Sequence, residues 1–160
     1  MSLIYLGLGS NQGDKLKNIE KALALITERV GKILTLSDFY ETLPWGYDSP
    51  ETYLNAVAKV EMVLSPEDVL LITQAIERVI GRQEKTKNGV YHDRLIDIDI
   101  LLYDNLILQT PELTIPHSFM HQREFVLQPL SQIAPSLIHP VFGKSILELL
   151  EKLGASSNNI

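Results

Sequence analysis

Three absences narrow what this chain can be. It contains no cysteine, which excludes structural disulfides, thiolate zinc sites and cysteine nucleophiles, and which fits a reducing cytoplasm. No apolar run approaches the roughly 18 residues that a membrane-spanning helix needs, and no basic segment precedes the apolar N-terminal stretch, so we expect neither a membrane span nor a secretory signal. The net charge of −6 argues against a general nucleic-acid-binding protein, which would carry a basic surface.

The chain does have enough apolar residues for one sizeable core. Hydrophobic residues make up 45% of its 160 residues, a length that suits one domain and would be cramped for two. No internal repeat or linker divides it. We therefore predict a single domain over residues 1–160, located in the cytoplasm.

Hydrophobic periodicity predicts the element order β-α-β-β-α-β. The alternation of apolar and polar residues makes 53–62 the clearest strand, and Ser65 followed by Pro66 is the clearest helix start. This order is typical of an α/β (α+β) fold, a ferredoxin-like βαββαβ sandwich with helices on one face and additional C-terminal elements. The expected strands are 3–8, 32–40, 53–62, 95–103 and 106–109, and the expected helices are 16–30, 66–80, 122–134 and 145–153.

Three patterns that suggest other chemistry are set aside. The glycines of 7–13 follow a strand and precede a helix, but the third comes one residue late for a dinucleotide-binding fingerprint. Gly-Lys-Ser at 143–145 resembles the end of a phosphate-binding loop, but Ile138 stands where the first glycine belongs. His117 and His121 have the spacing of zinc ligands on a helix, but no glutamate follows the first and no third ligand is evident.

An acidic pair interrupts the apolar strand at 95–103. Asp97 and Asp99 share one face of this strand, roughly 6.5–7 Å apart along the chain. Two adjacent carboxylates in an apolar strand repel each other and lose hydration. A divalent cation offsets both costs, and Mg²⁺ prefers oxygen ligands while leaving room for phosphates. The alternative is a pair that merely faces solvent on an edge strand.

Basic residues gather just before this pair. Residues 78–94 carry five of the 14 basic residues of the chain. Cations for phosphate oxygens beside carboxylates for a metal are what a polyphosphate with Mg²⁺ requires. A solvated polar loop is the alternative.

A second group of residues suits a flat heterocycle. Tyr53 and Asn55 share the polar face of the strand at 53–62, and the Asn55 amide offers both a donor and an acceptor to a ring edge. Trp45, Tyr53 and Phe125 could hold a flat ring, although each aromatic taken alone is more often part of a core.

Together these motifs resemble the 6-hydroxymethyl-7,8-dihydropterin pyrophosphokinases of folate biosynthesis. The resemblance covers residues 3 to about 135. It implies a ferredoxin-like sandwich that transfers the diphosphate of ATP to the pterin hydroxymethyl group and releases AMP. The motifs that carry it are Gly9-Ser10-Asn11, Tyr53-Leu54-Asn55, Gln74 with Glu77, Arg82, Arg94-x-x-Asp97-x-Asp99, Pro116-His117 and Arg123-x-Phe125.

The resemblance also implies roles for individual residues. Two Mg²⁺ ions would be held by Asp97 and Asp99, which with Arg82 and Arg94 form the expected catalytic group. The pterin would be lined by Thr42, Leu43, Pro44, Trp45, Tyr53, Asn55, Tyr91 and Phe125. ATP would be surrounded by Gln74, Glu77, Arg82, Lys85, Arg94, Ile100, Thr114, His117 and Arg123.

The chain departs from the family pattern at a few loop positions. Glu84 and Glu112 stand where the family often has arginine, and Tyr91 and Asp93 replace a tryptophan and a proline. The metal pair and the pterin residues are unaffected.

Two other functions are weighed against this one. A metal-dependent nucleotide hydrolase would share the carboxylates but would not need a flat-ring pocket. A small-molecule binding module would not need arginines beside two acids. We expect a monomer whose partners are small molecules, with no nucleic acid and no membrane.

Overall fold

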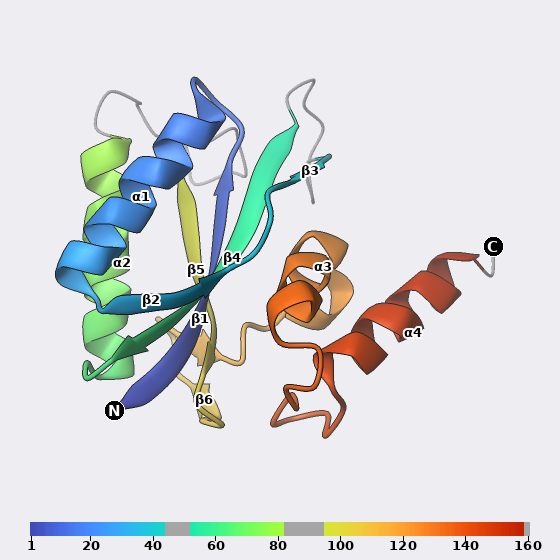
Figure 1. Cartoon of the computed structure of the whole chain (residues 1–160). Coiled ribbons are helices and arrows are strands. Elements are labelled where there is room, and N and C mark those ends of the chain that lie inside the picture. Colours follow the sequence, from blue (N-terminus) through green and yellow to red (C-terminus); the bar gives the residue numbers. More distant parts are fainter. Residues whose placement is uncertain (44–51, 82–94, 159–160) are drawn as a thin grey trace.

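The fold is an antiparallel sheet with helices on both faces (Figure 1). The computed structural model describes residues 1–43, 52–81 and 95–158. The main sheet has the strand order β2-β4-β1-β5, and the short strand β3 also pairs with β4. Every pairing is antiparallel, which gives the ferredoxin-like arrangement that the element order predicted. The strands are β1 (Ser2–Ser10), β2 (Lys32–Leu36), β3 (Tyr40–Thr42), β4 (Tyr53–Met62) and β5 (Asp97–Tyr103).

One predicted strand is in fact two. Residues 32–40 divide into β2 and β3 at Ser37. The Ser37 backbone N–H donates to the Val57 carbonyl oxygen, and the Val57 N–H donates to Ser37 Oγ rather than to a carbonyl, each over 2.9 Å. Because a side-chain hydroxyl accepts this bond, the regular ladder is interrupted and the chain leaves the sheet before β3 begins.

Helices α1 (Lys15–Arg29) and α2 (Pro66–Ile80) cover one face of the sheet, as predicted. The Asp14 side chain caps α1 by accepting from the Lys17 N–H, and Ser65 caps α2 by accepting from the Asp68 N–H, so each helix begins with one of its backbone donors satisfied. The core under these helices is a continuous layer of aliphatic residues, among them Ile4, Leu6, Ile19, Ile76, Ile98 and Ile100.

The C-terminal additions cover part of the opposite face. A two-stranded ribbon of β6 (Leu108–Gln109) and β7 (Thr114–Ile115) leads through a 3-10 turn, η1 (Met120–Gln122), to α3 (Glu124–Ile133) and α4 (Ile146–Asn158). A second core lies here, built from Tyr5, Val57, Leu101, Leu127, Leu130 and Ile146. Within the described ranges, no helix is long and apolar enough to cross a membrane.

Candidate active site

A cavity of about 430 Å³ is lined by the first turn of α3 on one side and reaches α2 at the edge of the sheet. Its floor is the C-terminal end of β1, where Gly9 pairs with Asn55 on one side and with Asp97 on the other. Gly7 pairs in the same way with Val57 and Asp99. Directly paired residues point to the same face of a sheet, so the two glycines leave the space between the β4 and β5 side chains empty.

The glycine floor was missed by reasoning from the sequence. The glycines of 7–13 suggest a dinucleotide fingerprint and Gly9 belongs to a family motif, but neither pattern by itself indicates a floor. The signal lies in the alternation of Gly7 and Gly9 with the apolar residues Leu6 and Leu8, which leaves one strand face without side chains. Gly13 serves another purpose, because its φ of +66° turns the chain toward α1 in a conformation that L side chains rarely adopt.

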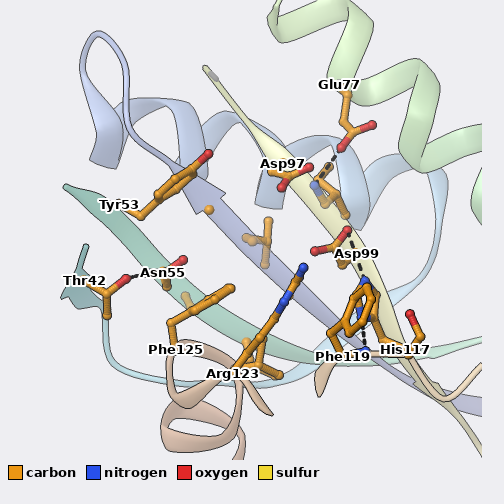
Figure 2. Close-up of a pocket in the computed structure, with 18 of the residues that line it drawn as sticks. Thr42, Tyr53, Asn55, Glu77, Asp97, Asp99, His117, Phe119, Arg123 and Phe125 are labelled. Atoms are coloured by element: carbon orange, nitrogen blue, oxygen red, sulfur yellow. Dashed lines mark hydrogen bonds and ion pairs between the residues drawn. The ribbon is translucent and has the colours of Figure 1, made fainter. Parts of the chain in front are cut away.

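One end of the cavity is suited to a flat ring. Asn55 Nδ2 donates to Thr42 Oγ1 over 2.6 Å and also faces the Tyr40 carbonyl oxygen at 3.5 Å. A carbonyl oxygen can only accept, so this contact assigns Nδ2 to the β3 side. Asn55 Oδ1 lies on the other side, over Gly9, where a Cβ would approach it to 3.1 Å. Figure 2 shows the rings of Tyr53 and Phe125 at this same end.

The other end of the cavity is acidic. Asp97 and Asp99 both line it, while the alternating residues Ile96, Ile98 and Ile100 are buried in the core under α1 and α2, as the alternation predicted. Ile98 also borders the cavity. Although β5 is an edge strand, its acids face the cavity (Figure 2). The carboxylate of Glu77, on α2, accepts from the Ile98 N–H over 2.8 Å and so fixes the backbone between the two acids.

His117 lies beside the acidic pair in its neutral form. Its backbone N–H donates to the Leu101 carbonyl oxygen, which places its Nε2 atom 4.0 Å from Asp99 Oδ1. Burial, together with the charge of Arg123, lowers the pKa of His117 to about 4, although Asp97 acts in the opposite direction. The Phe119 N–H faces Nδ1 at 3.4 Å, so the imidazole proton belongs on Nε2 and points toward Asp99.

Arg123 is held between two aromatic rings. Its guanidinium carbon lies 5.6 Å from the centroid of Phe119 and 5.5 Å from that of Phe125, within the range of a cation–π contact. The residue is 8% exposed and lines the cavity with both rings. Phe119 was not predicted as a site residue, and no motif in the sequence marks it.

The cavity brings together eleven of the residues that the resemblance assigned. They are Thr42, Leu43, Tyr53, Asn55, Gln74, Glu77, Asp97, Asp99, His117, Arg123 and Phe125.

Two of the assigned residues lie elsewhere in the described structure. The Ile100 side chain is buried in the core on the opposite face, which leaves only its backbone for any ligand contact. Thr114 lines a smaller neighbouring cavity that shares His117 with the main one. Six further assigned residues, Pro44, Trp45, Arg82, Lys85, Tyr91 and Arg94, lie outside the described residues.

The fold and the site define an α/β-sandwich enzyme with a pocket for a small molecule. The family model described as 7,8-dihydro-6-hydroxymethylpterin-pyrophosphokinase matches residues 5–135. The chain therefore belongs to this family, as the motifs predicted, and it is a pyrophosphokinase of folate biosynthesis that acts on hydroxymethyldihydropterin.

Similar proteins agree with this membership. A 2-amino-4-hydroxy-6-hydroxymethyldihydropteridine pyrophosphokinase of Porphyromonas gingivalis is 55% identical over 141 residues, covering 88% of this chain and 95% of the relative. The Aquifex aeolicus protein of the same name is 40% identical over 148 residues, covering 92% of this chain and 90% of the relative. A crystal structure of Plasmodium falciparum HPPK-DHPS matches 99% of this chain with a TM-score of 0.80; the chain spans 46% of that longer protein, and at 18% identity the likeness shows the fold alone.

Proposed function

We propose that this enzyme transfers the β,γ-diphosphate of ATP to the hydroxymethyl oxygen of 6-hydroxymethyl-7,8-dihydropterin, in a reaction that depends on Mg²⁺ and releases AMP. The observation that carries the proposal is the shared cavity. A flat-ring end with Asn55 and Phe125 and an acidic end with Asp97 and Asp99 open onto one glycine floor. The pterin must be held by its ring while its hydroxymethyl oxygen reaches the polyphosphate of ATP, so the reaction needs both ends in one space.

At the ring end, Asn55 reads the edge of the pterin as an acceptor. Its Nδ2 atom is committed to Thr42 and Tyr40, so Oδ1 is the atom left to face a ligand. It would accept a ring or amino N–H, while the Phe125 ring stacks on the pterin plane. Pro44, Trp45 and Tyr91 belong to this end by resemblance.

At the acidic end, the donor set fits Mg²⁺. Asp97 and Asp99 supply carboxylate oxygens, and the described residues include no group of three His, Cys, Asp or Glu side chains that could complete a metal site. This fits a cation that binds through one or two carboxylates and keeps positions for phosphate oxygens and water. Asp97 and Asp99 would hold two such ions, which when bound neutralise phosphate charge.

The other assigned residues of the cavity orient ATP. Arg123 is pre-positioned by its two aromatic neighbours and would pair with phosphate oxygens, while Gln74 and Glu77 border the nucleotide from α2. Neutral His117 adds a donor at the acidic end without adding positive charge. The hydroxymethyl oxygen bonds to the β-phosphorus as the bond from that phosphorus to the phosphate oxygen of AMP breaks on the opposite side, and the hydroxyl proton is released to water. Catalysis here rests mainly on positioning. Arg82, Lys85, Arg94 and Thr114 belong to the ATP site by resemblance.

The test is AMP formation with Mg²⁺, ATP and the dihydropterin, compared with reactions lacking the pterin or containing a chelator. We expect AMP only when pterin and Mg²⁺ are both present, and a loss of this activity in Asp97→Ala. Glu20→Ala, which removes an exposed carboxylate from α1, is the matched control. Phosphate or ADP release regardless of pterin would favour a nucleotide hydrolase, and ligand binding without turnover would favour a binding module.

We also propose that residues 1–160 act as one domain and as a monomer in the cytoplasm. The family match spans 5–135, and α4 packs on α3 in the second core, which supports one folded unit. Light scattering of the purified chain at several concentrations tests the monomer, and a single cooperative unfolding transition tests the single domain.

A further inference from the structure

Gln132, on α3, uses its whole side-chain amide to hold a segment far away in the sequence. Its Oε1 atom accepts from the Asp38 N–H over 2.8 Å and from the Tyr40 hydroxyl over 3.1 Å. Its Nε2 atom donates to Asp38 Oδ2 over 2.8 Å. A backbone N–H can only donate and a carboxylate can only accept, so the contacts with Asp38 define the orientation of the amide.

Apart from Gln132, the segment is attached to β4, through Ser37 before it and through the short ladder of β3 after it. The chain has left the sheet at Ser37, and Asp38 precedes β3. Strand β3 has three residues and, among the described strands, pairs only with β4. Such a short strand has few ladder bonds of its own, so an external anchor at its start affects where the whole strand lies.

This short strand orients the Asn55 amide. Thr42 Oγ1 accepts from Asn55 Nδ2 over 2.6 Å, and the Tyr40 carbonyl oxygen faces the same nitrogen. A shift of β3 therefore turns Asn55 or breaks its hydrogen bond. The anchoring helix α3 also carries Phe125, close to its first residue. Gln132 thus connects β3, which orients the Asn55 amide, to α3, which carries Phe125.

We infer that Gln132 is a positioning residue that sets the separation between Asn55 and Phe125 and thereby the affinity for the pterin. The inference rests on the proposed function, because it takes a pterin as the ring bound at this end. Gln132 does not line the cavity, and its side chain is exposed. Its effect must therefore be transmitted through β3 rather than through contact with the ligand.

Gln132→Ala should weaken pterin binding selectively. We expect KM and Kd for the pterin to rise about 3- to 10-fold, as the loss of a few partly exposed hydrogen bonds would produce. KM for ATP and kcat should change less than about twofold, because the acidic end lies on β5 and is anchored through Glu77 and His117. Glu151→Ala, on α4 and likewise exposed, should leave all three constants unchanged.

A charge exchange tests the contact itself. Gln132→Glu keeps the acceptor for Asp38 N–H and Tyr40 but sets a carboxylate against that of Asp38, so pterin affinity should fall. Adding Asp38→Asn supplies an amide that donates to the new carboxylate, and the double variant should recover most of the affinity. Tyr40→Phe, which removes only one of the three hydrogen bonds, provides a milder variant if Gln132→Ala proves unstable.

Steady-state kinetics with each substrate varied, together with calorimetric titration of the pterin, distinguish the outcomes. Equal changes in the pterin and ATP constants, or none in either, would overturn the inference, as would a double variant no better than Gln132→Glu. If the wild-type protein neither binds the pterin nor forms AMP, the proposed function fails. If it does both while the Gln132 variants match it, only the inference fails.

Discussion

The two faces of the sheet serve different purposes. On the face covered by α1 and α2, the inward side chains form a continuous apolar core, with Ile4, Leu6 and Leu8 along β1. On the other face, each strand is apolar at one end and borders the cavity at the other: Tyr5 and Gly9 mark these two ends on β1, Val57 and Asn55 on β4, and Leu101 and Asp97 on β5. Helix α3 packs on the apolar ends through Leu127 and Leu130, and its first turn places Phe125 beside the cavity.

This difference shows how one sheet can supply a stabilising core on one face and a substrate cavity on the other. Burial of the first face provides a continuous core that does not depend on a ligand. The second face is closed only where apolar residues make closure favourable, and the cavity lies at its other end. Substitutions at neighbouring positions of one strand should therefore have opposite consequences, depending on the face to which they point.

Asp99→Ala should have the largest effect, and on activity alone. Removing one carboxylate of the pair should lower kcat/KM by about 10²–10³-fold or more, the scale seen when one preorganised electrostatic contact is lost. The free energy of unfolding should change little, because the relief of repulsion with Asp97 offsets the lost contact with His117. Pterin-dependent AMP formation measures the loss of activity, and urea unfolding measures the free energy of unfolding. A destabilised protein would contradict the contrast between the faces.

Ile98→Ala, the residue before Asp99, should act on stability. Ile98 is 6% exposed on the α2 side, so the truncation leaves a cavity in the core and should lower the free energy of unfolding by about 2–5 kcal/mol. Chemical denaturation measures the loss. Val79→Ala, on the exposed side of α2, is the control and should change stability by less than about 0.5 kcal/mol. Comparable losses in both variants would mean that burial on this face does not carry the stability.

Gly9→Ala should weaken the ring end of the cavity. The added Cβ would lie 3.1 Å from Asn55 Oδ1 and 3.3 Å from the Tyr53 ring, so it would raise the floor beneath the pterin. We expect KM for the pterin to rise about tenfold, with a smaller change for ATP. Gly7→Ala, where a Cβ meets Leu101 at an ordinary contact distance of 3.4 Å, should have a weaker effect. Kinetics in which Gly7→Ala proves the more damaging would refute this account of the floor.

His117 should produce the smallest effect, seen in the pH dependence of stability. Its folded pKa of about 4 lies below the ordinary 6.5, so in this window the unfolded chain takes up a proton that the folded chain does not. Stability contributed by neutral His117 is therefore complete above pH 6.5 and is lost as the pH falls toward 4.

Urea unfolding of the wild type and of His117→Gln between pH 7 and 4.5 measures the contribution of His117 to stability. The variant should lose less stability on acidification than the wild type, although some loss should persist because burial also lowers the pKa of His139. If the free energy of unfolding falls with pH as steeply in the variant as in the wild type, His117 does not titrate as its surroundings imply.

Much of the site was predictable because its pattern is local. The alternation that puts Asp97 and Asp99 on one face of β5, and Tyr53 with Asn55 on one face of β4, follows from the period of a strand. The division of 32–40 into two strands was not predictable, because it depends on a hydrogen bond between Ser37 and Val57, far apart in the chain. The Phe119–Arg123–Phe125 arrangement likewise needs the turn of η1 into α3.

The sequence by itself determined most of the helices and strands, the face on which each acid lies and the family to which the chain belongs, since these follow from local periodicity and from motifs in order. The tertiary structure alone decided that the glycines of β1 would lie between the ring end and the acidic end, and that Gln132 would hold β3. Both depend on which strands pair and on where α3 packs on the sheet. Such contacts join residues distant in the chain, and the burial that selects them belongs to the whole fold rather than to any one segment.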